Sequence, residues 1–177
     1  MIVPIVKVPN PVLYQTAKKV VKFDAKLKRL ICDMGDTLKA ARNPEGVGLA
    51  APQVGIGLRL YVTKPTKQSK VRAYINPEII KTEDLKTPEG EKKDSSTLEG
   101  CLSVDRIWSQ ISRPLKVQMK YIDEDGKKHT EWFEGSKATI MQHEIDHLNG
   151  TLFTNRALEQ NSLVYEEKNG KLEEVKI

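Results

Sequence analysis

The sequence predicts an α+β fold in which antiparallel β-sheets surround a central helix that carries an H-E-x-x-H motif. Two observations point to this class. Apolar residues alternate with polar ones in several short segments in the middle of the chain, as in strands, whereas two other segments repeat apolar residues at helical spacing. The chain has 177 residues, of which 38% are hydrophobic and 30% charged, so it is large enough to bury one core. We therefore expect a single domain over residues 1–177.

The first helix is expected between Asp24 and Arg42. Its apolar residues recur at steps of three and four, at Leu27, Leu30, Ile31, Met34 and Leu38. Asp24 is a candidate N-cap. Cys32 lies one position off the apolar stripe, and we interpret it as a small residue at the edge of the core.

A glycine-rich loop, "NPEGVGLAAPQVGIG", separates this helix from the expected strands. Strands are predicted over Leu58–Thr63 and Val71–Pro77, where apolar residues alternate. The segment "LKVQMKYIDEDGKKHTEWFE" predicts a hairpin that turns at Asp125-Gly126.

The remaining segments are a charged loop, a second helix and a tail. Residues 81–98 are half charged, which predicts a mobile surface loop. The segment "SKATIMQHEIDHL" predicts a helix with Ser136 as its N-cap. The tail, about residues 162–177, predicts a hairpin around Asn169-Gly170.

The overall composition excludes several classes of protein. The net charge of +5 permits weak attraction to acidic partners, but no basic stripe interleaved with aromatic residues is present, so we expect no sequence-specific nucleic-acid binding. No apolar run reaches the roughly 18–20 residues of a membrane span, and the N-terminal segment does not resemble a signal peptide. Cys32 and Cys101 stand in unrelated contexts, which favours a reducing compartment, and we expect a cytoplasmic location.

The most informative stretch is "MQHEIDHLNG", which holds two of the three histidines. Residues four apart lie on one face of a helix, so His143 and His147 could bind one metal ion together. Glu144 could then act as a general base on a metal-bound water. A solvated helix face with two histidines is the alternative, and the adjacent glutamate and apolar neighbours make it the weaker one.

A catalytic site of this kind needs a third protein ligand. Cys101, in "EGCLS", is a better candidate than His129, which stands among lysines in the expected hairpin. Glu99 could orient a metal ligand or pair with Arg113, and both could instead be ordinary surface charges.

The segment "GVGLAAPQ" allows a close approach of the backbone to a ligand, because Gly46 and Gly48 lack side chains. Taken by itself, such a loop is more often a structural turn than a binding site. It lacks the Lys-Ser/Thr of a phosphate-binding loop and the third glycine of a dinucleotide-binding loop. Gln53 could donate a hydrogen bond to a developing oxyanion.

Taken together and in this order, "GVGLAAPQ", "EGCLS" and "QHEIDHLNG" resemble the three motifs of the peptide deformylases. "NPVLYQTA", "INPE" and "DEDGK" extend the likeness, which covers residues 1 to about 155. The resemblance implies removal of the formyl group from formyl-methionine at the start of nascent polypeptides. It assigns Cys101, His143 and His147 as metal ligands and Glu144 as the general base and acid.

The resemblance also implies further roles in the site. Gln53 and the backbone N–H of Leu102 would hold the oxyanion, and Val47, Gly48 and Gly100 would bind the substrate. The metal would be one divalent ion, with Fe(II) as the expected native ion and Zn, Ni or Co as substitutes.

The expected partners are formyl-methionyl nascent peptides, with transient ribosome association and a monomeric enzyme. Ser136, Lys137 and Thr139 stand where the family often has apolar residues near the methionine pocket, which predicts a flatter preference for the first side chain.

Two other functions compete with this hypothesis. An H-E-x-x-H-type metallopeptidase would usually take its third ligand from a histidine or glutamate downstream, but no histidine follows His147 and "EGCLS" would remain unexplained. A non-enzymatic protein with a structural metal would need a fourth protein ligand, and Cys32 is the only other cysteine.

Overall fold

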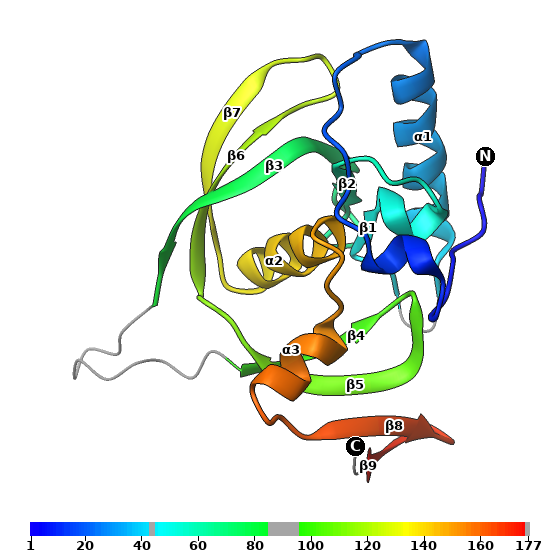
Figure 1. The fold of residues 1–177 in the computed structure, drawn as a ribbon, viewed down its shortest axis with the longest axis vertical. Coiled ribbons are helices and arrows are strands. Elements are labelled where there is room, and N and C mark those ends of the chain that lie inside the picture. Colours follow the sequence, from blue (N-terminus) through cyan, green and yellow to red (C-terminus); the bar gives the residue numbers. More distant parts are fainter. Residues whose placement is uncertain (43–44, 85–95, 176–177) are drawn as a thin grey trace.

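Two antiparallel β-sheets with helices packed against them make up the fold (Figure 1). The structure is a computed structural model that describes residues 1–42, 45–84 and 96–175. The predicted α+β class is therefore confirmed. The first sheet has the strand order β1-β2-β3-β6-β7 and the second has the order β4-β5-β8-β9. Helix α2 lies between the two sheets in the view of Figure 1.

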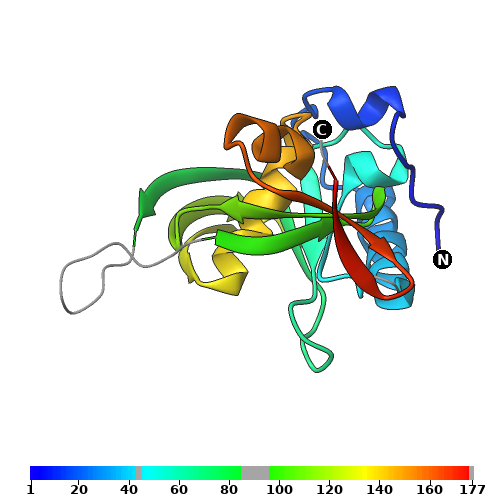
Figure 2. The same cartoon turned by 90° about the horizontal axis from the view of Figure 1, so that it is seen from below.

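The first sheet is built from hairpins and one long strand. Its strands are β1 (Gly48–Ala50), β2 (Leu60–Thr63), β3 (Arg72–Glu83), β6 (Lys116–Ile122) and β7 (Lys128–Glu134). Every neighbouring pair is antiparallel. The connection between β2 and β3 projects from the body of the molecule (Figure 2). Because β1 pairs only with β2, it forms an edge of this sheet.

The second sheet begins with a hairpin that the sequence analysis did not predict. Its strands are β4 (Ser96–Cys101), β5 (Val104–Ser112), β8 (Val164–Lys168) and β9 (Lys171–Val175). Strands β8 and β9 are the expected terminal hairpin, and β8 also pairs with β5. Strand β4 is the edge of this sheet, and it carries Cys101 at its end.

Besides the strands, the described residues form three α-helices and two short 3-10 helices: η1 (Pro11–Tyr14), α1 (Ala25–Ala40), η2 (Ala51–Val54), α2 (Ser136–Leu148) and α3 (Phe153–Glu159). In α1, the carboxylate of Asp24 accepts the N–H of Leu27 at 3.0 Å, which confirms the predicted cap. In α2, the N-cap is Gly135 rather than Ser136. Gly135 has φ 57°, a backbone conformation that suits glycine, and Ser136 is already the first helical residue.

The core has three clusters, and α2 belongs to the first. Its apolar residues pack against β6 and β7, in a cluster that includes Tyr61, Tyr74, Met119, Met141 and Ile145. A second cluster joins α1 to β2 and β3, and a third joins β5 to α3. Helix α2 therefore has one face fixed in the core, and its remaining face is turned toward the second sheet.

The two described ends of the predicted charged loop belong to strands. Residues 81–83 continue β3 and residues 96–98 begin β4, while 85–95 lie outside the described residues. A strand can carry charged side chains where its side chains reach solvent. Residues 81–83 of β3 are all exposed. Among the described residues, no helix has the length and apolar character needed for a membrane crossing.

Candidate metal centre

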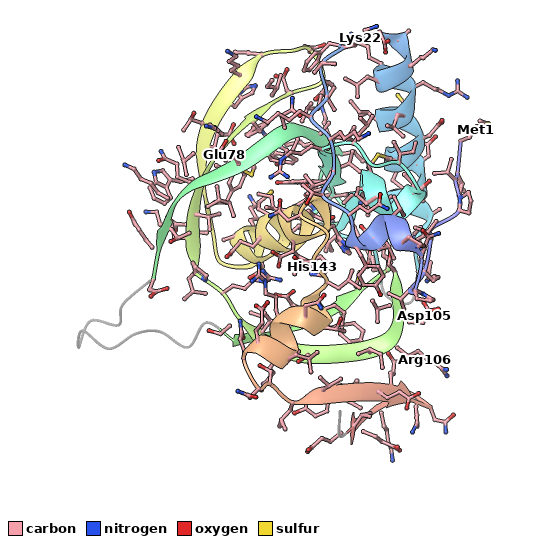
Figure 3. The ribbon with its side chains drawn as sticks, viewed as in Figure 1. Met1, Lys22, Glu78, Asp105, Arg106 and His143 are labelled. Carbon is pink, nitrogen blue, oxygen red and sulfur yellow. The ribbon has the colours of Figure 1, made fainter. Side chains whose placement is uncertain are left out.

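Helix α2 places two imidazoles side by side. His143 and His147 lie one turn apart, and their ring centroids are 5.0 Å apart. His147 is buried and His143 is largely buried. His143 also stacks on Phe153 of α3, with ring centroids 6.2 Å apart. Figure 3 shows His143 on α2, in the interior between the two sheets.

Cys101 approaches these histidines from the end of β4. A register shift between Gly100 and Cys101 ends the regular pairing with β5 at this point. The Cys101 Sγ atom lies 3.2 Å from His147 Nε2 and accepts the N–H of Ser103 at 3.4 Å. The cysteine is buried. Like Glu99 two residues earlier on β4, the thiol of Cys101 points toward α2.

Cys101, His143 and His147 are the group that could hold a metal ion. Their ligand atoms all lie within 4.8 Å of one another. His129, the weaker candidate for a third ligand, instead contacts Asp123 at 2.6 Å on the β6–β7 hairpin. Cys32 is exposed on α1. The described residues therefore offer three ligands, which is the number typical of a catalytic site and one fewer than a closed structural site needs.

The electrostatics of the three groups fit a metal. Burial alone would raise the pKa of the Cys101 thiol, but the charge of His147 and the hydrogen bonds from both imidazoles outweigh it and lower that pKa well below its usual value. A thiolate is the form of cysteine that binds metals, and thiolate with imidazole suits Fe(II), Zn and similar ions. The donor set therefore fits one divalent transition-metal ion.

One histidine is held by a carboxylate. Glu99 Oε2 accepts from His143 Nδ1 at 2.9 Å, which turns the other ring nitrogen toward Cys101. Glu99 also accepts from Arg113 Nη2 at 3.0 Å. Both roles left open for Glu99 by the sequence therefore occur together. In contrast, His147 Nδ1 is buried and has no partner among the described residues.

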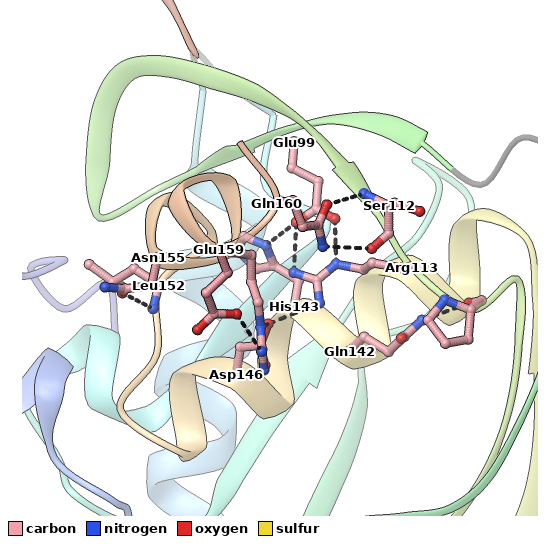
Figure 4. A network of polar contacts seen from close by, with 12 residues as sticks. Glu99, Ser112, Arg113, Gln142, His143, Asp146, Leu152, Asn155, Glu159 and Gln160 are labelled. Carbon is pink, nitrogen blue, oxygen red and sulfur yellow. Dashed lines mark hydrogen bonds and ion pairs between the residues drawn. The ribbon is translucent and has the colours of Figure 1, made fainter. Parts of the chain in front are cut away.

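The network continues behind the site (Figure 4). Arg113 Nη1 donates to Asp146 Oδ2 at 2.9 Å, and Asp146 Oδ1 accepts from Arg156 Nη2 of α3 at 2.8 Å. Arg113 and Asp146 are both buried. Asp146 therefore supports His143 indirectly, through Arg113 and Glu99, rather than by contact with an imidazole.

Glu144 lies on the side of α2 that faces β1. Its side chain is 3% exposed, and Oε2 has no hydrogen-bond partner within the described part of the chain. Burial raises the pKa of Glu144 to about 7, against the lowering influence of His143 and His147. A Cβ atom at Gly48 would lie only 2.2 Å from Glu144 Oε1. A side chain at position 48 would therefore displace the carboxylate.

Gln53 lies on the other side of Cys101. Its carbonyl oxygen accepts the N–H of Ala50 at 2.9 Å, and its Nε2 points toward Cys101 Sγ at 3.5 Å and Ser103 Oγ at 3.2 Å. The amide is buried and its orientation is fixed. The N–H donor of Gln53 is thus held beside the ligand cluster.

A cavity of about 380 Å³ opens onto this cluster between the two sheet edges. Of the nine residues assigned as metal ligands, catalytic groups or substrate-binding residues, all but His147 line it: Val47, Gly48, Gln53, Gly100, Cys101, Leu102, His143 and Glu144. The cavity lies between β1 and β4, each of which is an edge strand of its sheet.

Comparisons with known proteins agree with this geometry. Residues 2–162 match the family model described as polypeptide deformylase. The peptide deformylase of Brucella suis is 40% identical over 153 residues, which cover 85% of this chain and 81% of the relative. The peptide deformylase of Zymomonas mobilis is 42% identical over 159 residues, which cover 86% and 84%.

The chain belongs to the peptide deformylase family.

Solved structures of peptide deformylases have the same fold. The enzyme of Legionella pneumophila superposes with a TM-score of 0.79 at 39% identity and covers 88% of this chain and 86% of that one. The enzyme of Thermotoga maritima gives a TM-score of 0.76 at 38% identity and covers 88% and 97%. Membership in the peptide deformylase family does not favour the alternative of an H-E-x-x-H-type metallopeptidase.

Sequence reasoning missed two residues of this deformylase site. Arg156 was not considered, and no spacing within the sequence connects it with Asp146 ten residues earlier on another helix. Thr97 lines the cavity but falls within the segment that was interpreted as a charged loop. Thr97, Glu99 and Cys101 are spaced two residues apart, as on one face of a strand. This spacing could have indicated that Thr97 lies on the same side as Cys101.

Proposed function

We propose that this protein is a metal-dependent amidohydrolase that removes the formyl group from formyl-methionine at the N-terminus of nascent polypeptides and releases formate. The observation that carries the proposal is the approach of Cys101, His143 and His147 within 4.8 Å, with Glu144 in the wall of the same cavity. Membership in the peptide deformylase family supports the same reaction.

Cys101, His143 and His147 would hold one divalent ion, with Fe(II) as the expected native ion and Zn, Ni or Co as substitutes. When bound, the ion supplies Lewis-acid polarisation of the formyl carbonyl and lowers the pKa of water at the site. The thiolate contributes negative charge to the centre, which distinguishes this donor set from an all-histidine or carboxylate set.

Glu144 would transfer the proton from the attacking water to the leaving amine. With a pKa near 7, its carboxylate can accept a proton from the attacking water and then deliver it to the nitrogen of the leaving amine. The formyl C–N bond breaks, the carbon leaves as formate, and the peptide keeps a free amino group. The absence of a hydrogen-bond partner for Glu144 Oε2 among the described residues leaves that oxygen available for this exchange.

Gln53 and the backbone N–H of Leu102 would stabilise the oxyanion that develops on the formyl oxygen. Both residues line the cavity, and the hydrogen bond from Ala50 to Gln53 fixes the amide before substrate arrives. Such preorganised donors typically contribute about 10²–10³-fold to turnover.

The substrate backbone would lie between two sheet edges. Val47 and Gly48 stand at the β1 edge and Gly100 at the β4 edge, and all three line the cavity. An extended peptide can hydrogen-bond to an exposed strand edge as an added strand. Gly100 has no room for a side chain, because a Cβ atom there would lie 2.7 Å from the Trp108 ring.

The test is formate release by the metal-loaded protein under anaerobic conditions. We expect Fe(II)- or Ni(II)-loaded protein to release formate from formyl-Met-Ala-Ser. Glu144→Gln should retain the metal and lose at least about 10²-fold in kcat, the lower end of what general acid–base catalysis contributes. Glu134→Gln, an exposed glutamate on β7, is the matched control. Full activity in Glu144→Gln, or a protein that binds no metal, would contradict the proposal.

The cellular setting belongs to the same proposal. We place the enzyme in the cytoplasm as a monomer, with one catalytic domain across residues 1–177 and transient ribosome association while it acts on emerging chains. Co-sedimentation with translating ribosomes tests the ribosome association. Light scattering of the purified protein tests the monomeric state.

A further inference from the structure

Strand β4 runs along helix α2 in a regular register. Cys101 contacts His147, and two residues earlier Glu99 contacts His143, which is four residues earlier on the helix. Two strand residues advance about 6.6 Å and four helix residues about 6 Å, so the steps match. One more step in the same direction sets Thr97 opposite Thr139, and both residues line the cavity.

This end of the cavity carries hydroxyl groups with unused hydrogen-bonding capacity. Thr97 Oγ1 is buried and has no partner among the residues that the structure describes. Thr139 Oγ1 makes only a 3.5 Å contact with the carbonyl of Gly135, the limit of a hydrogen bond. Ser136 adds a third hydroxyl to the cavity lining, three residues before Thr139 on the same helix face.

Lys137 does not take part in this surface. It is exposed and does not line this cavity, and together with Ser136 it lines a neighbouring cavity beside β7. Successive residues of a helix point in different directions, so Lys137 can be absent from this lining although its neighbour Ser136 belongs to it. The hydroxyls alone offer hydrogen bonds without a countercharge, so they suit a neutral polar group better than an ionised one.

Building on the proposed deformylation, we propose that Thr97 and Thr139 recognise a neutral hydrogen-bonding group at the end of the first side chain of a formylated peptide. Glutamine and methionine sulfoxide are the side chains of methionine-like length that carry such a group. A threonine hydroxyl can donate to an amide or sulfoxide oxygen, whereas an apolar wall would leave that oxygen unpaired. The two hydroxyls therefore favour these polar side chains more than an apolar wall would, while methionine remains a substrate, which is a sharper expectation than a flat preference.

The experiment compares three substrates, formyl-X-Ala-Ser, with X as norleucine, glutamine or methionine sulfoxide. The measured quantity is the ratio of kcat/KM for each polar substrate to that for norleucine. We expect this ratio to fall about tenfold in Thr97→Val/Thr139→Val, because two net hydrogen bonds are lost. Thr97→Ser/Thr139→Ser should restore the ratio, and Thr130→Val, at an exposed position on β7, should leave it at the wild-type value.

The two single valine variants are measured as well, so that a folding defect in the double variant does not remove the test. The dissociation constants of Gln-Ala-Ser and Nle-Ala-Ser, measured by calorimetry on the Ni(II)-loaded protein, provide a second ratio that does not depend on turnover. A ratio unchanged by valine, or glutamine used less than about one-hundredth as well as norleucine, would overturn this inference alone. No formate from any of the three substrates would overturn the proposed function as well.

Discussion

At the scale of single residues, the site depends on a few side chains held by specific neighbours. Glu99 holds His143, and the absence of a side chain at Gly48 makes room for Glu144. Partners of this kind orient a catalytic group without touching substrate, and misplacement by about 1 Å can cost 10²-fold in rate.

We expect Glu99→Gln to weaken metal binding by about 10–100-fold. The neutral amide keeps the shape of the side chain, but it removes the charge that His143 and Arg113 both face. Competition with a chromophoric chelator measures the change in affinity. Glu131→Gln on β7 is the control for loss of a carboxylate away from the cluster. Metal affinity equal to that of the wild type would show that Glu99 serves Arg113 alone.

We expect Gly48→Ala to lower kcat/KM by about 10²-fold while the metal content stays at one ion per chain. The new Cβ would lie 2.2 Å from Glu144 Oε1, so the carboxylate must move. Gly57→Ala is a matched control, because its Cβ would meet nothing within 4 Å. Steady-state kinetics with metal analysis separates the two effects. Equal losses in both variants would argue against the steric explanation.

At the scale of elements, α2 is joined to the second sheet and to α3 by one carboxylate. Asp146 accepts from Arg113, which follows β5, and from Arg156 on α3. The two arginines therefore connect α2 to the segment after β5 and to α3. Burial would lower the pKa of Arg113, but its bonds to Glu99 and its contact with Asp146 outweigh this and raise it. The charged form is therefore the stable one in the folded protein.

We expect Asp146→Ala to lower the free energy of unfolding by about 3–5 kcal/mol, because it leaves buried charge with one partner fewer. Glu159→Ala is the control. Glu159 pairs with Arg156 at 3.0 Å at an exposed position, so its loss should cost about 0–1 kcal/mol. Chemical denaturation of both variants with the metal bound provides the comparison. A difference below about 1 kcal/mol between them would contradict the structural role given to Asp146.

At the scale of the whole molecule, the sequence predicted local features well and long-range partners poorly. The spacing of His143 and His147 follows from the helical repeat, and Asp24 caps its helix from three residues away. Such relations are encoded within one turn. The opposite holds for Glu99 and Arg113, whose pairing was left open because it depends on how β4 and β5 close as a hairpin.

Strands β4 and β5 were not predicted for a related reason. The sequence before Ser96 is rich in charged residues, and the predicted loop was extended through it to Leu98. The alternation of Thr97, Glu99 and Cys101, which is typical of a strand, was therefore not recognised. Helix α3 has only seven residues, too few for an apolar period to be evident. These elements are specified by contacts across the fold, including the stacking of Phe153 on His143.

The ligand cluster joins the two halves of the fold, so metal loading should stabilise the whole domain. Cys101 belongs to the second sheet, and the histidines belong to a helix packed on the first. A ligand present at about 10³ times its dissociation constant stabilises the native state by roughly 4 kcal/mol. For a domain of this size, each kcal/mol raises Tm by about 2–4 °C. We therefore expect metal removal to lower Tm by about 8–16 °C.

Two cysteine variants make this expectation specific to the cluster. Cys101→Ala should abolish the difference in Tm between metal-loaded and metal-free protein, because two imidazoles alone bind weakly and leave no bridge between the sheet and the helix. Cys32→Ala should retain the full difference, since Cys32 is exposed on α1 and outside the cluster. Differential scanning calorimetry under anaerobic conditions measures both. A metal-dependent shift that survives Cys101→Ala would mean that the stabilising ion binds elsewhere, and the thiol would then have no part in joining β4 to α2.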